Sequence, residues 1–528
     1  MKKIQYVKLV GLLTILLFLN ISCKDDDTLL RGSGITEQSW STNQTYFASA
    51  EQTLTFTFTT LSSWTAQNSS TALLSLDNTA GNSGENTIKV TVHKSSQEQG
   101  TITIKVNGYS SASNIKIQLS DDDVQGYEIN YSVDQYLREK YLWNDDYKLL
   151  TPNFRQAYDE FLRNTLLSMT TNTLDKKRNS NGTYSLFSFI QKLDPDLQTS
   201  RSAKEKKTLE YNYGFVNFIA VGNRNTSNYG LVIQGVHKGS SADKEGLKRG
   251  MEITEIDNQR ITTANVQACY SKLIKPSSPT SIKVKDKDGK VYTINSGPIY
   301  ANPIIHHQVK EKIGYLVYSA FESGFDQELF DVFKEFKSQN ITELILDLRY
   351  NGGGDVTSAN LMSSCIAGDF CVDKTFASYR YNDERMKALG NQRPIQKFAY
   401  SQYDNLSTSL SAGGLKLQKI YCLVTDDSAS ASELVINALR GIDIEVILIG
   451  TTHGKNVGME GVELTAGTDK YLLFPITFQA YNAKGFGDFE NGFTPDYEIN
   501  ENQPNGEYFE GYGDFGTESD PLYAKAIS

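Results

Sequence analysis

Polar and apolar residues alternate along much of the chain between residues 31 and 120. Such alternation is typical of half-buried β-strands, because successive side chains face opposite sides of a sheet. Turn-forming residues separate the alternating runs, which are clearest at 54–58, 88–92, 102–106 and 115–119. We therefore predict an all-β sandwich over residues 31–120.

Between residues 125 and 205 the apolar residues recur every three or four positions instead. Val133, Leu137 and Tyr141 share one helical face, and a second set with similar spacing begins at Phe154. This period predicts amphipathic helices whose aromatic residues are packing surface. Nothing in the helical segment 125–205 stands out as a candidate for chemistry.

Strand patterns return over residues 208–297, and strands alternate with helices over 298–528. The second pattern predicts an α/β domain. Its strands at 420–424 and 444–450 flank a short helical stretch, so they form a parallel crossover pair. The turns after both strands then open on the same edge of the sheet, where α/β proteins bind their ligands. The Gly-rich turn after the strand at 344–349 could open there too.

Composition narrows the classes of function. The chain has 528 residues, which predicts three or four domains, and its 39% hydrophobic and 22% charged residues exclude wholesale disorder. With 62 acidic and 52 basic residues the net charge is −10, so nothing favours nucleic acid as a partner. Five cysteines and five histidines are scattered, and we expect no metal or other cofactor. Cys365 and Cys371 could pair outside the cytoplasm.

The first 22 residues are typical of a targeting segment. Three lysines within the first eight positions precede an apolar run at 9–19 that is too short to span a bilayer comfortably. Cys23 and the residues before it resemble the lipobox of bacterial lipoproteins, although Asn20 replaces the usual aliphatic residue. The resemblance implies a signal peptide over 1–22, acylation of Cys23 and a tether over 23–30.

Lys24 and the three aspartates after it resemble the export signal of surface lipoproteins in the Bacteroidetes group. We therefore expect an outer-membrane lipoprotein of the cell envelope, which could be surface exposed and whose lipid anchor makes the membrane a partner. A plain secretory signal with an incidental cysteine is the alternative.

Two residues at the predicted sheet edge could act together on a carbonyl group. Ser430 begins a helix, where the dipole favours developing negative charge, and Lys455 follows the next strand. Serine needs a base, and lysine can serve only if burial lowers its pKa from about 10.4 towards roughly 7–8. The backbone N–H of Ala431, with that of Gly353 or Gly354, could hold an oxyanion. A serine that merely caps its helix is the structural alternative.

Three motifs lie in this part of the chain: Asp-Leu-Arg-Tyr-Asn-Gly-Gly-Gly at 347–354, Ser-Ala-Ser-Ala-Ser-Glu at 428–433 and Gly-Phe-Thr-Pro-Asp at 492–496. In this order they resemble the S41 family of C-terminal processing peptidases, and the likeness extends over about residues 125–528. The resemblance implies a crotonase/ClpP-like core over 298–528, a Ser430–Lys455 dyad and hydrolysis of peptide bonds near protein C-termini.

One position departs from that family's pattern. Many members carry Gln four residues after the lysine, whereas this chain has Met459, whose thioether lacks the donors of an amide. Glu433, Thr452 or Glu460 could orient Lys455 instead. A carboxylate in contact with the ammonium would raise the lysine pKa and hinder its action as a base. Thr452 carries no charge and would disturb the lysine pKa less than Glu433 or Glu460, but the choice among the three stays open.

The run at 239–250 resembles the PDZ domains of processing proteases, which implies a PDZ domain over 208–297. Such domains hold the C-terminal carboxylate of a peptide while the peptide adds a strand to the sheet. The loop that would do so comprises Tyr213, Gly214, Phe215 and Val216. The implied partner is a protein or peptide with a free C-terminus. A PDZ fold that acts only as an intramolecular clamp or regulator is the alternative.

The N-terminal sandwich, with Trp64 in a Ser-Ser-Trp stretch, resembles the BACON module of Bacteroidetes surface proteins. That family is suspected of binding glycan, which makes glycan a candidate partner. No aromatic platform is evident in this sequence, so we expect Trp64 in the core and a spacer role for the module.

Together these observations predict a multi-domain, lipid-anchored serine endopeptidase: a sandwich, a helical segment, a PDZ domain and an α/β peptidase core. The competing hypothesis is a catalytically silent surface lipoprotein that binds glycan or peptide. A folding or assembly scaffold is a third class, and it would need a partner that the sequence does not show.

Overall fold

The computed structural model of the chain describes residues 30–41, 45–120, 124–178, 182–193, 209–222, 227–274, 276, 278–400, 403, 406, 409–451, 454–503, 509 and 511–528. The predicted signal peptide, Cys23 and Thr452 lie outside the described residues, as does the tether except for its last residue. The chain divides into two compact units, Met1–Glu128 and Ile129–Ser528. Within the described ranges, no helix is long and apolar enough to cross a membrane.

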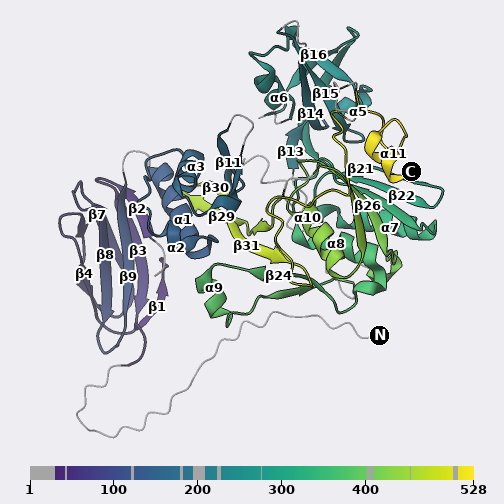
Figure 1. Cartoon of the computed structure of the whole chain (residues 1–528). Helices are drawn as coiled ribbons and strands as arrows, with labels where there is room; N and C mark the ends of the chain where they lie inside the picture. The colour runs from purple at the N-terminus through teal and green to yellow at the C-terminus, as the bar shows by residue number, and fades with distance from the viewer. Residues whose placement is uncertain are drawn as a thin grey trace, which may run out of the picture. The chain divides into compact units, whose positions relative to one another are not determined.

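The first unit is a β-sandwich, which confirms the fold predicted from the alternating pattern (Figure 1). One sheet has the strand order β1-β3-β7-β5, the other β2-β9-β8-β4-β6, and both contribute to one hydrophobic core. Trp64 is a core residue as expected, because it is 2% exposed and meets the ring of Phe58 edge-on at 4.9 Å between centroids. The strands are β1 (Ile35–Gln38), β2 (Thr45–Ser49), β3 (Thr53–Thr60), β4 (Trp64–Asn68), β5 (Leu74–Leu76), β6 (Ala80–Gly81), β7 (Gly84–Val92), β8 (Gln99–Val106) and β9 (Ala112–Ser120).

Among the described residues of the predicted helical segment, the last α-helix ends at Ser168. Its helices are α1 (Val124–Lys140), α2 (Asn144–Tyr147) and α3 (Tyr158–Ser168), and the apolar face that includes Val133 and Leu137 is buried. Short elements rather than helices follow: η1 (Thr173–Asp175), β10 (Lys176–Arg178), β11 (Tyr184–Leu186) and β12 (Phe189–Lys192). Tertiary pairing explains the difference, because β12 joins a sheet of the C-terminal domain as the antiparallel neighbour of β30 (Asp469–Phe474).

The PDZ region is a separate small sheet with its own core, in the order β14-β15-β16-β18-β19. Strand β14 lies at the edge of this sheet, and helix α6 packs against it. The elements are β13 (Leu209–Asn212), β14 (Phe215–Gly222), β15 (Tyr229–Val236), α5 (Ser241–Lys244), β16 (Glu252–Ile256), β17 (Gln259–Arg260), α6 (Val266–Ile274), β18 (Ser281–Asp286), β19 (Val291–Asn295) and β20 (Gly297–Tyr300).

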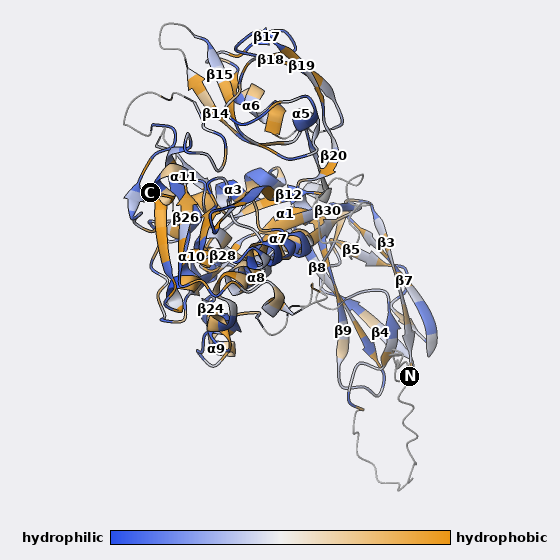
Figure 2. Ribbon diagram, turned by 90° about the vertical axis from the view of Figure 1, so that its right-hand side faces the viewer, coloured by the Kyte–Doolittle hydropathy of each residue, from blue (hydrophilic) through white to orange (hydrophobic). Residues whose placement is uncertain are grey.

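The α/β domain is built on a six-stranded sheet with the order β21-β22-β23-β26-β27-β32, in which only β21 runs antiparallel to its neighbour. Its apolar strands are buried on both faces, and β26 appears orange in Figure 2. Helices α7, α8 and α10 cover one face, and α11 covers the other. The elements of this layer are β21 (Ile304–Lys310), β22 (Ile313–Tyr318), α7 (Asp326–Ser338), β23 (Glu343–Asp347), α8 (Val356–Ala367), β26 (Lys419–Val424), α10 (Ala431–Gly441), β27 (Glu445–Gly450), β32 (Tyr497–Glu498) and α11 (Pro521–Ala526).

A second group of strands in the same domain lies beside α10. The sheet β25-β24-β31-β28 carries residues that follow Lys455, and β29 and β30 extend into the sheet shared with β12. The helical segment and these strands share one hydrophobic core, so the described residues between 129 and 193 pack as part of the α/β domain. The remaining elements are η2 (Ser323–Phe325), η3 (Gly368–Cys371), β24 (Thr375–Arg380), α9 (Asp383–Ala388), β25 (Ile395–Lys397), η4 (Leu410–Ala412), β28 (Val457–Met459), β29 (Val462–Ala466) and β31 (Ile476–Tyr481).

Candidate active site

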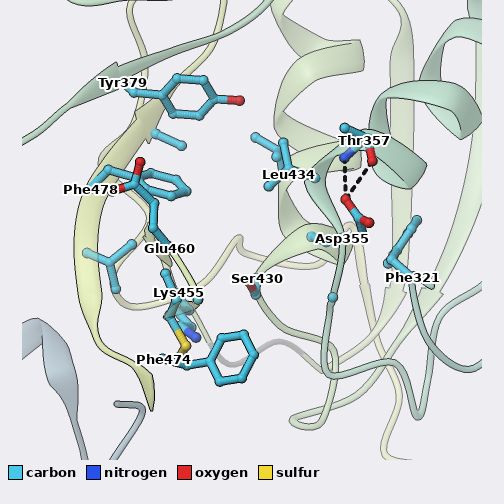
Figure 3. Close-up of a pocket in the computed structure, with 18 of the residues that line it drawn as sticks. Phe321, Asp355, Thr357, Tyr379, Ser430, Leu434, Lys455, Glu460, Phe474 and Phe478 are labelled. Atoms are coloured by element: carbon cyan, nitrogen blue, oxygen red, sulfur yellow. Dashed lines mark hydrogen bonds between the residues drawn. The ribbon is translucent and has the colours of Figure 1, made fainter. Parts of the chain in front are cut away.

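A cavity of about 820 Å³ lies at the carboxyl edge of the parallel strands, and both Ser430 and Lys455 line it (Figure 3). Strands β26 and β27 are parallel neighbours, from Lys419 opposite Glu445 to Val424 opposite Gly450. The turns after these strands carry the serine and the lysine, so the crossover that the sequence predicts brings the two residues to one cavity. No hydrogen bond joins their side chains among the described residues.

Ser430 occupies a strained position at the start of α10. Its φ of 58° and ψ of −112° lie in a region that L-residues rarely adopt, and such strain is found preferentially at functional sites. Its backbone N–H donates to Oε2 of Glu433 at 3.1 Å. Ser430 and Glu433 also form a capping box at the start of α10, but a cap does not require a positive φ, so capping alone does not account for this conformation.

Lys455 is buried in the cavity wall, with only 8% of the residue exposed. Burial lowers its pKa to about 8, although the carboxyl groups of Asp175 and Glu433 act in the opposite direction. Its Nζ lies 4.8 Å from the centre of the Phe187 ring. The lowered pKa leaves about a tenth of the amine neutral at pH 7, and this neutral form is the one that can abstract a proton.

The Gly-rich turn after β23 packs directly against the start of α10. At Gly353, where φ is +107°, an added Cβ would lie 2.7 Å from Cβ of Ser430 and 2.9 Å from the nitrogen of Ala431. The N–H of Gly353 donates to Oδ1 of Asn351 at 2.9 Å. Among the hydrogen bonds of the described residues, the N–H groups of Gly354 and Ala431 donate to no acceptor. Two backbone donors beside Ser430 are therefore available to a ligand.

The motif at 492–496 lies against the turn that precedes the lysine. Gly454 has a φ of +112°, and an added Cβ there would overlap the backbone nitrogen of Gly492. The backbone N–H of Asp496 donates to the Leu448 carbonyl at 3.0 Å, and its carboxylate accepts from the Leu448 N–H at 2.8 Å. The motif thus supports β27 and the turn from which Lys455 projects.

Of the candidates to orient Lys455, only Glu433 is both described and close to it. Burial raises the pKa of Glu433 to about 8, so much of this carboxyl is uncharged near neutral pH. Glu460 forms an ion pair with Arg385 instead, with Nη2 and Oε1 2.9 Å apart. Met459 lines the cavity, and Thr452 lies outside the described residues.

The helical segment supplies residues that the sequence did not reveal as candidates. Phe187 faces the lysine amine, and Asp175 acts on it electrostatically. Phe189 also lines the cavity, where its ring stacks on Phe474 at 4.9 Å between centroids. Their position depends on the pairing of β12 with β30, which joins segments more than 270 residues apart. No local pattern signals such a contact.

Seven aromatic side chains also line the cavity. The ring of Phe478 meets that of Tyr379 edge-on at 5.0 Å, and Leu434 of α10 also lines the cavity (Figure 3). The aromatic lining residues are Phe189, Phe321, Tyr379, Tyr381, Phe474, Phe478 and Phe489. A large apolar side chain would be well accommodated in such a cavity.

The predicted carboxylate-binding loop lies at the start of the PDZ edge strand. At Gly214 φ is +112°, and an added Cβ would overlap the side chain of Ser240. The Gly214 N–H donates to Oδ1 of Asn212 at 2.6 Å. Nearby, the Tyr270 hydroxyl of α6 donates to Oδ1 of Asn217 in β14 at 2.7 Å. The loop, the edge strand and α6 are therefore adjacent within this domain.

Two further expectations concern cysteines and metals. Cys365 and Cys371 are both buried and both free thiols, so the pairing that their spacing allowed is absent between these two described residues. Among the described residues, no group of three or more His, Cys, Asp or Glu side chains is arranged to hold a metal ion.

The sheets and the cavity define a multi-domain protein with a small separate sheet domain and an α/β domain that holds the cavity. The family model described as "Peptidase family S41" matches residues 312–499, and the PDZ domain model matches 207–285. The chain therefore contains a domain similar to peptidase family S41 and a PDZ domain, and the relatives that it resembles include C-terminal processing proteases.

Individual relatives agree with this assignment. The chain is 24% identical over 285 residues to carboxyl-terminal-processing peptidase 3 of Arabidopsis thaliana chloroplasts, covering 50% of each chain. It is 24% identical over 289 residues to the carboxy-terminal processing protease CtpA of Bacillus subtilis, covering 53% of this chain and 56% of that one. The chain thus spans about half the length of the curated relatives it matches.

A crystal structure of a Bacteroides fragilis protein assigned to the S41 proteases shares the fold. It superposes with a TM-score of 0.58 at 24% identity, covering 75% of this chain and 96% of that one. Neither the lipid anchor nor the BACON-like character of the first unit is addressed by these relatives, and both stay predictions.

Proposed function

We propose that the protein is a serine endopeptidase in which Ser430 is the nucleophile and Lys455 the general base. The observation that carries the proposal is that a strained serine and a buried lysine of lowered pKa open on one cavity. The neutral amine of Lys455 would take the proton of the Ser430 hydroxyl while Oγ of Ser430 bonds to the substrate carbonyl carbon. The resulting ammonium would then protonate the leaving amine as the peptide C–N bond breaks.

The second half of the reaction reuses the same groups. Lys455, neutral again, would take a proton from water as the water oxygen bonds to the acyl carbon, and would return it to Ser430 as the ester bond breaks. The oxyanion of each tetrahedral intermediate would accept from the N–H of Ala431 and that of Gly354, which donate to nothing else among the described residues. Gly353, whose N–H already donates to Asn351, would shape the hole.

Glu433 and Thr452 are the supporting residues in this proposal. Glu433 holds the backbone N–H of Ser430, and its mostly uncharged carboxyl avoids strongly stabilising the lysine ammonium. Thr452, three residues before the lysine, would help to orient it.

The test compares the wild-type full chain with Ser430→Ala and Lys455→Ala, using casein and a peptide with an apolar C-terminus. We expect cleavage by the wild type and a loss of about 10⁴-fold or more in either variant. Lys387→Ala, an exposed lysine of α9, is the matched control and should retain activity. Equal turnover in all four proteins would contradict the dyad, and no turnover in any would favour a binding protein.

We further propose that the PDZ domain captures the C-terminus of the substrate. Strand β14 pairs with β15 on one side only, so its outer edge can accept a peptide as an added strand. The peptide's carboxylate would meet the backbone of the loop formed by Tyr213, Gly214, Phe215 and Val216.

Peptide binding to the Ser430→Ala chain tests this capture without cleavage. A peptide with a free C-terminus should bind about ten-fold or more tightly than its C-terminally amidated form, because amidation removes the charge that the loop would hold. Acetylation of the peptide's N-terminus is the control and should leave the affinity unchanged. Equal affinities for the free and amidated forms would favour a PDZ domain that serves only as an intramolecular clamp.

We also propose that Cys23 is acylated and anchors the protein to the outer membrane, with the sandwich as a spacer or glycan-binding module. The basic and apolar start of the chain and the cysteine after it support the anchor. Incorporation of labelled palmitate into the wild type but not into Cys23→Ala, with release of the variant from membranes, is expected. Retention of Cys23→Ala in the membrane would contradict the anchor.

A further inference from the structure

A buried cluster of polar side chains lies behind the cavity, in the part of the chain predicted to be packing surface only. Asp175 is its centre: Oδ2 accepts from the Tyr141 hydroxyl at 2.7 Å and from the Ser188 hydroxyl at 2.6 Å. Oδ1 accepts from the Ser188 N–H at 2.8 Å, and Nδ2 of Asn172 donates to the Tyr141 hydroxyl at 3.0 Å. All four residues are buried.

This cluster continues to the lysine through two consecutive residues. The backbone N–H of Phe187 donates to the Asp175 carbonyl at 2.9 Å, and the ring of Phe187 lies 4.8 Å from Nζ of Lys455. The hydroxyl of Ser188 accepts from the backbone N–H of Ile476 at 2.9 Å. Ile476 begins β31, the antiparallel partner of β28, and β28 begins two residues after Lys455. The backbone carbonyl of Asp175 thus holds Phe187, whose ring lies against the amine, and its carboxylate holds Ser188, which contacts the strand pair beside the lysine.

Charged groups from two elements act on the Lys455 amine. Asp175 from η1 and Glu433 from α10 both act on Lys455. Lys455 and Lys176 both interact with Asp175, and Nζ of Lys176 donates to the Leu167 carbonyl at 3.2 Å. Burial raises the pKa of Asp175 above its ordinary value, and the hydrogen bonds from Ser188 and Tyr141 and the charge of Lys455 act in the opposite direction. Of these two carboxyl groups, Asp175 has the larger effect on the pKa of Lys455.

We propose that Asp175 is a positioning residue for Lys455: through Phe187 and Ser188 it holds the lysine amine at the cavity wall beside Ser430. This inference rests on the proposed function of Lys455 as general base. It gives the helical segment a role in the reaction, and it supplies a polar anchor that the thioether of Met459 cannot provide.

The test uses full-length Asp175→Asn, which keeps the size of the side chain and removes its charge. The rate of cleavage is measured against pH, and in parallel the reactivity of Lys455 towards a small amine-labelling reagent is followed by mass spectrometry. Loss of the anion makes the ammonium easier to deprotonate, so both titrations should move to lower pH by roughly half a unit or more. The plateau of kcat should fall by about ten-fold with little change in KM, because the base is less well held.

Asp145→Asn is the matched control, because Asp145 is an exposed carboxylate of the same segment, paired with Lys148 at 3.7 Å. Asp145→Asn should leave the midpoints of the cleavage and labelling titrations unchanged. If Asp175→Asn does not fold, Phe187→Leu serves instead: loss of the aromatic face also destabilises the ammonium and should move both titrations in the same direction.

The outcomes separate this inference from the proposed function. A folded Asp175→Asn or Phe187→Leu chain whose two titrations match the wild type would overturn the role of Asp175, even if the wild type is an active peptidase. If the labelling titration of Asp175→Asn shifts but the wild type cleaves no peptide, the result would support the effect of Asp175 on Lys455 and contradict the proposed peptidase activity.

Discussion

Arg249 of the PDZ domain donates a hydrogen bond from Nη1 to the hydroxyl of Tyr350 in the α/β domain, at 2.6 Å. Tyr350 lies three residues before Gly353, in the turn that packs against Ser430. The PDZ domain is therefore in direct contact with the segment proposed to shape the oxyanion hole.

This contact belongs to a buried cluster of ionised groups. Arg349 donates to Glu501 at 2.8 Å and to Asp520 at 2.6 Å, and the Tyr350 hydroxyl donates to Glu501 at 2.7 Å. Arg249 lies 3.2 Å from the same Glu501 carboxylate. Although burial alone would raise it, the guanidinium groups of Arg349 and Arg249 hold the pKa of Asp520 below its ordinary value.

We predict that Arg249→Met destabilises the second unit by about 3–5 kcal/mol, because it leaves buried carboxylates with too little positive charge. Thermal unfolding followed by circular dichroism measures the loss. Activity should fall as well at temperatures where the protein is still folded, since the Tyr350 turn loses a contact. Arg163→Met, at an exposed arginine of α3, is the control, and equal unfolding temperatures for the two variants would contradict the prediction.

The rate of peptide cleavage should rise with pH through a midpoint near 8. Burial lowers the pKa of Lys455 to about 8, and only the neutral amine can accept a proton, so kcat/KM increases as the ammonium is lost. Glu433 titrates in the same range and favours the ammonium once it ionises, which broadens the rise. The measurement is kcat/KM between about pH 6 and 10. A midpoint near that of an ordinary lysine, about 10.4, would show that the amine is solvated.

The residues of the cavity that could be predicted are those on local strand–turn–helix units. Ser430 and Gly353 each follow a buried strand and precede a helix, and the parallel crossover fixes which edge of the sheet they share. The order of domains could also be predicted, because the spacing of hydrophobic residues changes between them and this spacing depends on whether the local element is a strand or a helix.

The part that could not be predicted depends on contacts between distant segments. Asp175 and Phe187 reach Lys455 only because β12 adds to the sheet of β30, and no periodicity in either strand specifies its partner. Glu460 shows that closeness in sequence is not sufficient either. It lies near Lys455 in the chain and was a candidate to orient it, but its carboxylate forms a salt bridge with Arg385. The helical prediction was wrong at 176–178, 184–186 and 189–192 for the same reason, because strand pairing overrides a weak local pattern there.

Gly353→Ala should lower kcat by about 10²- to 10³-fold, the loss typical of a disturbed oxyanion hole. The new Cβ would press on Ser430 and on the nitrogen of Ala431, and φ of +107° is unfavourable for alanine. Gly352→Ala is the matched control, because its Cβ would meet only the Asp427 carbonyl, at 4.0 Å. Similar kcat values for the two variants would show that the turn does not shape the hole.

The aromatic wall of the cavity should select substrates with a large apolar residue before the scissile bond. Phe189 is 44% exposed, lines the cavity and stacks on Phe474, so Phe189→Ala removes apolar surface without opening the core. We expect the ratio of kcat/KM for a peptide with Phe at that position over one with Ala to fall about ten-fold. Phe370→Ala, an exposed phenylalanine that does not line the cavity, should leave the ratio unchanged. If Phe189→Ala lowers kcat/KM equally for both peptides, the ring supports the fold of the wall and does not contact the substrate side chain.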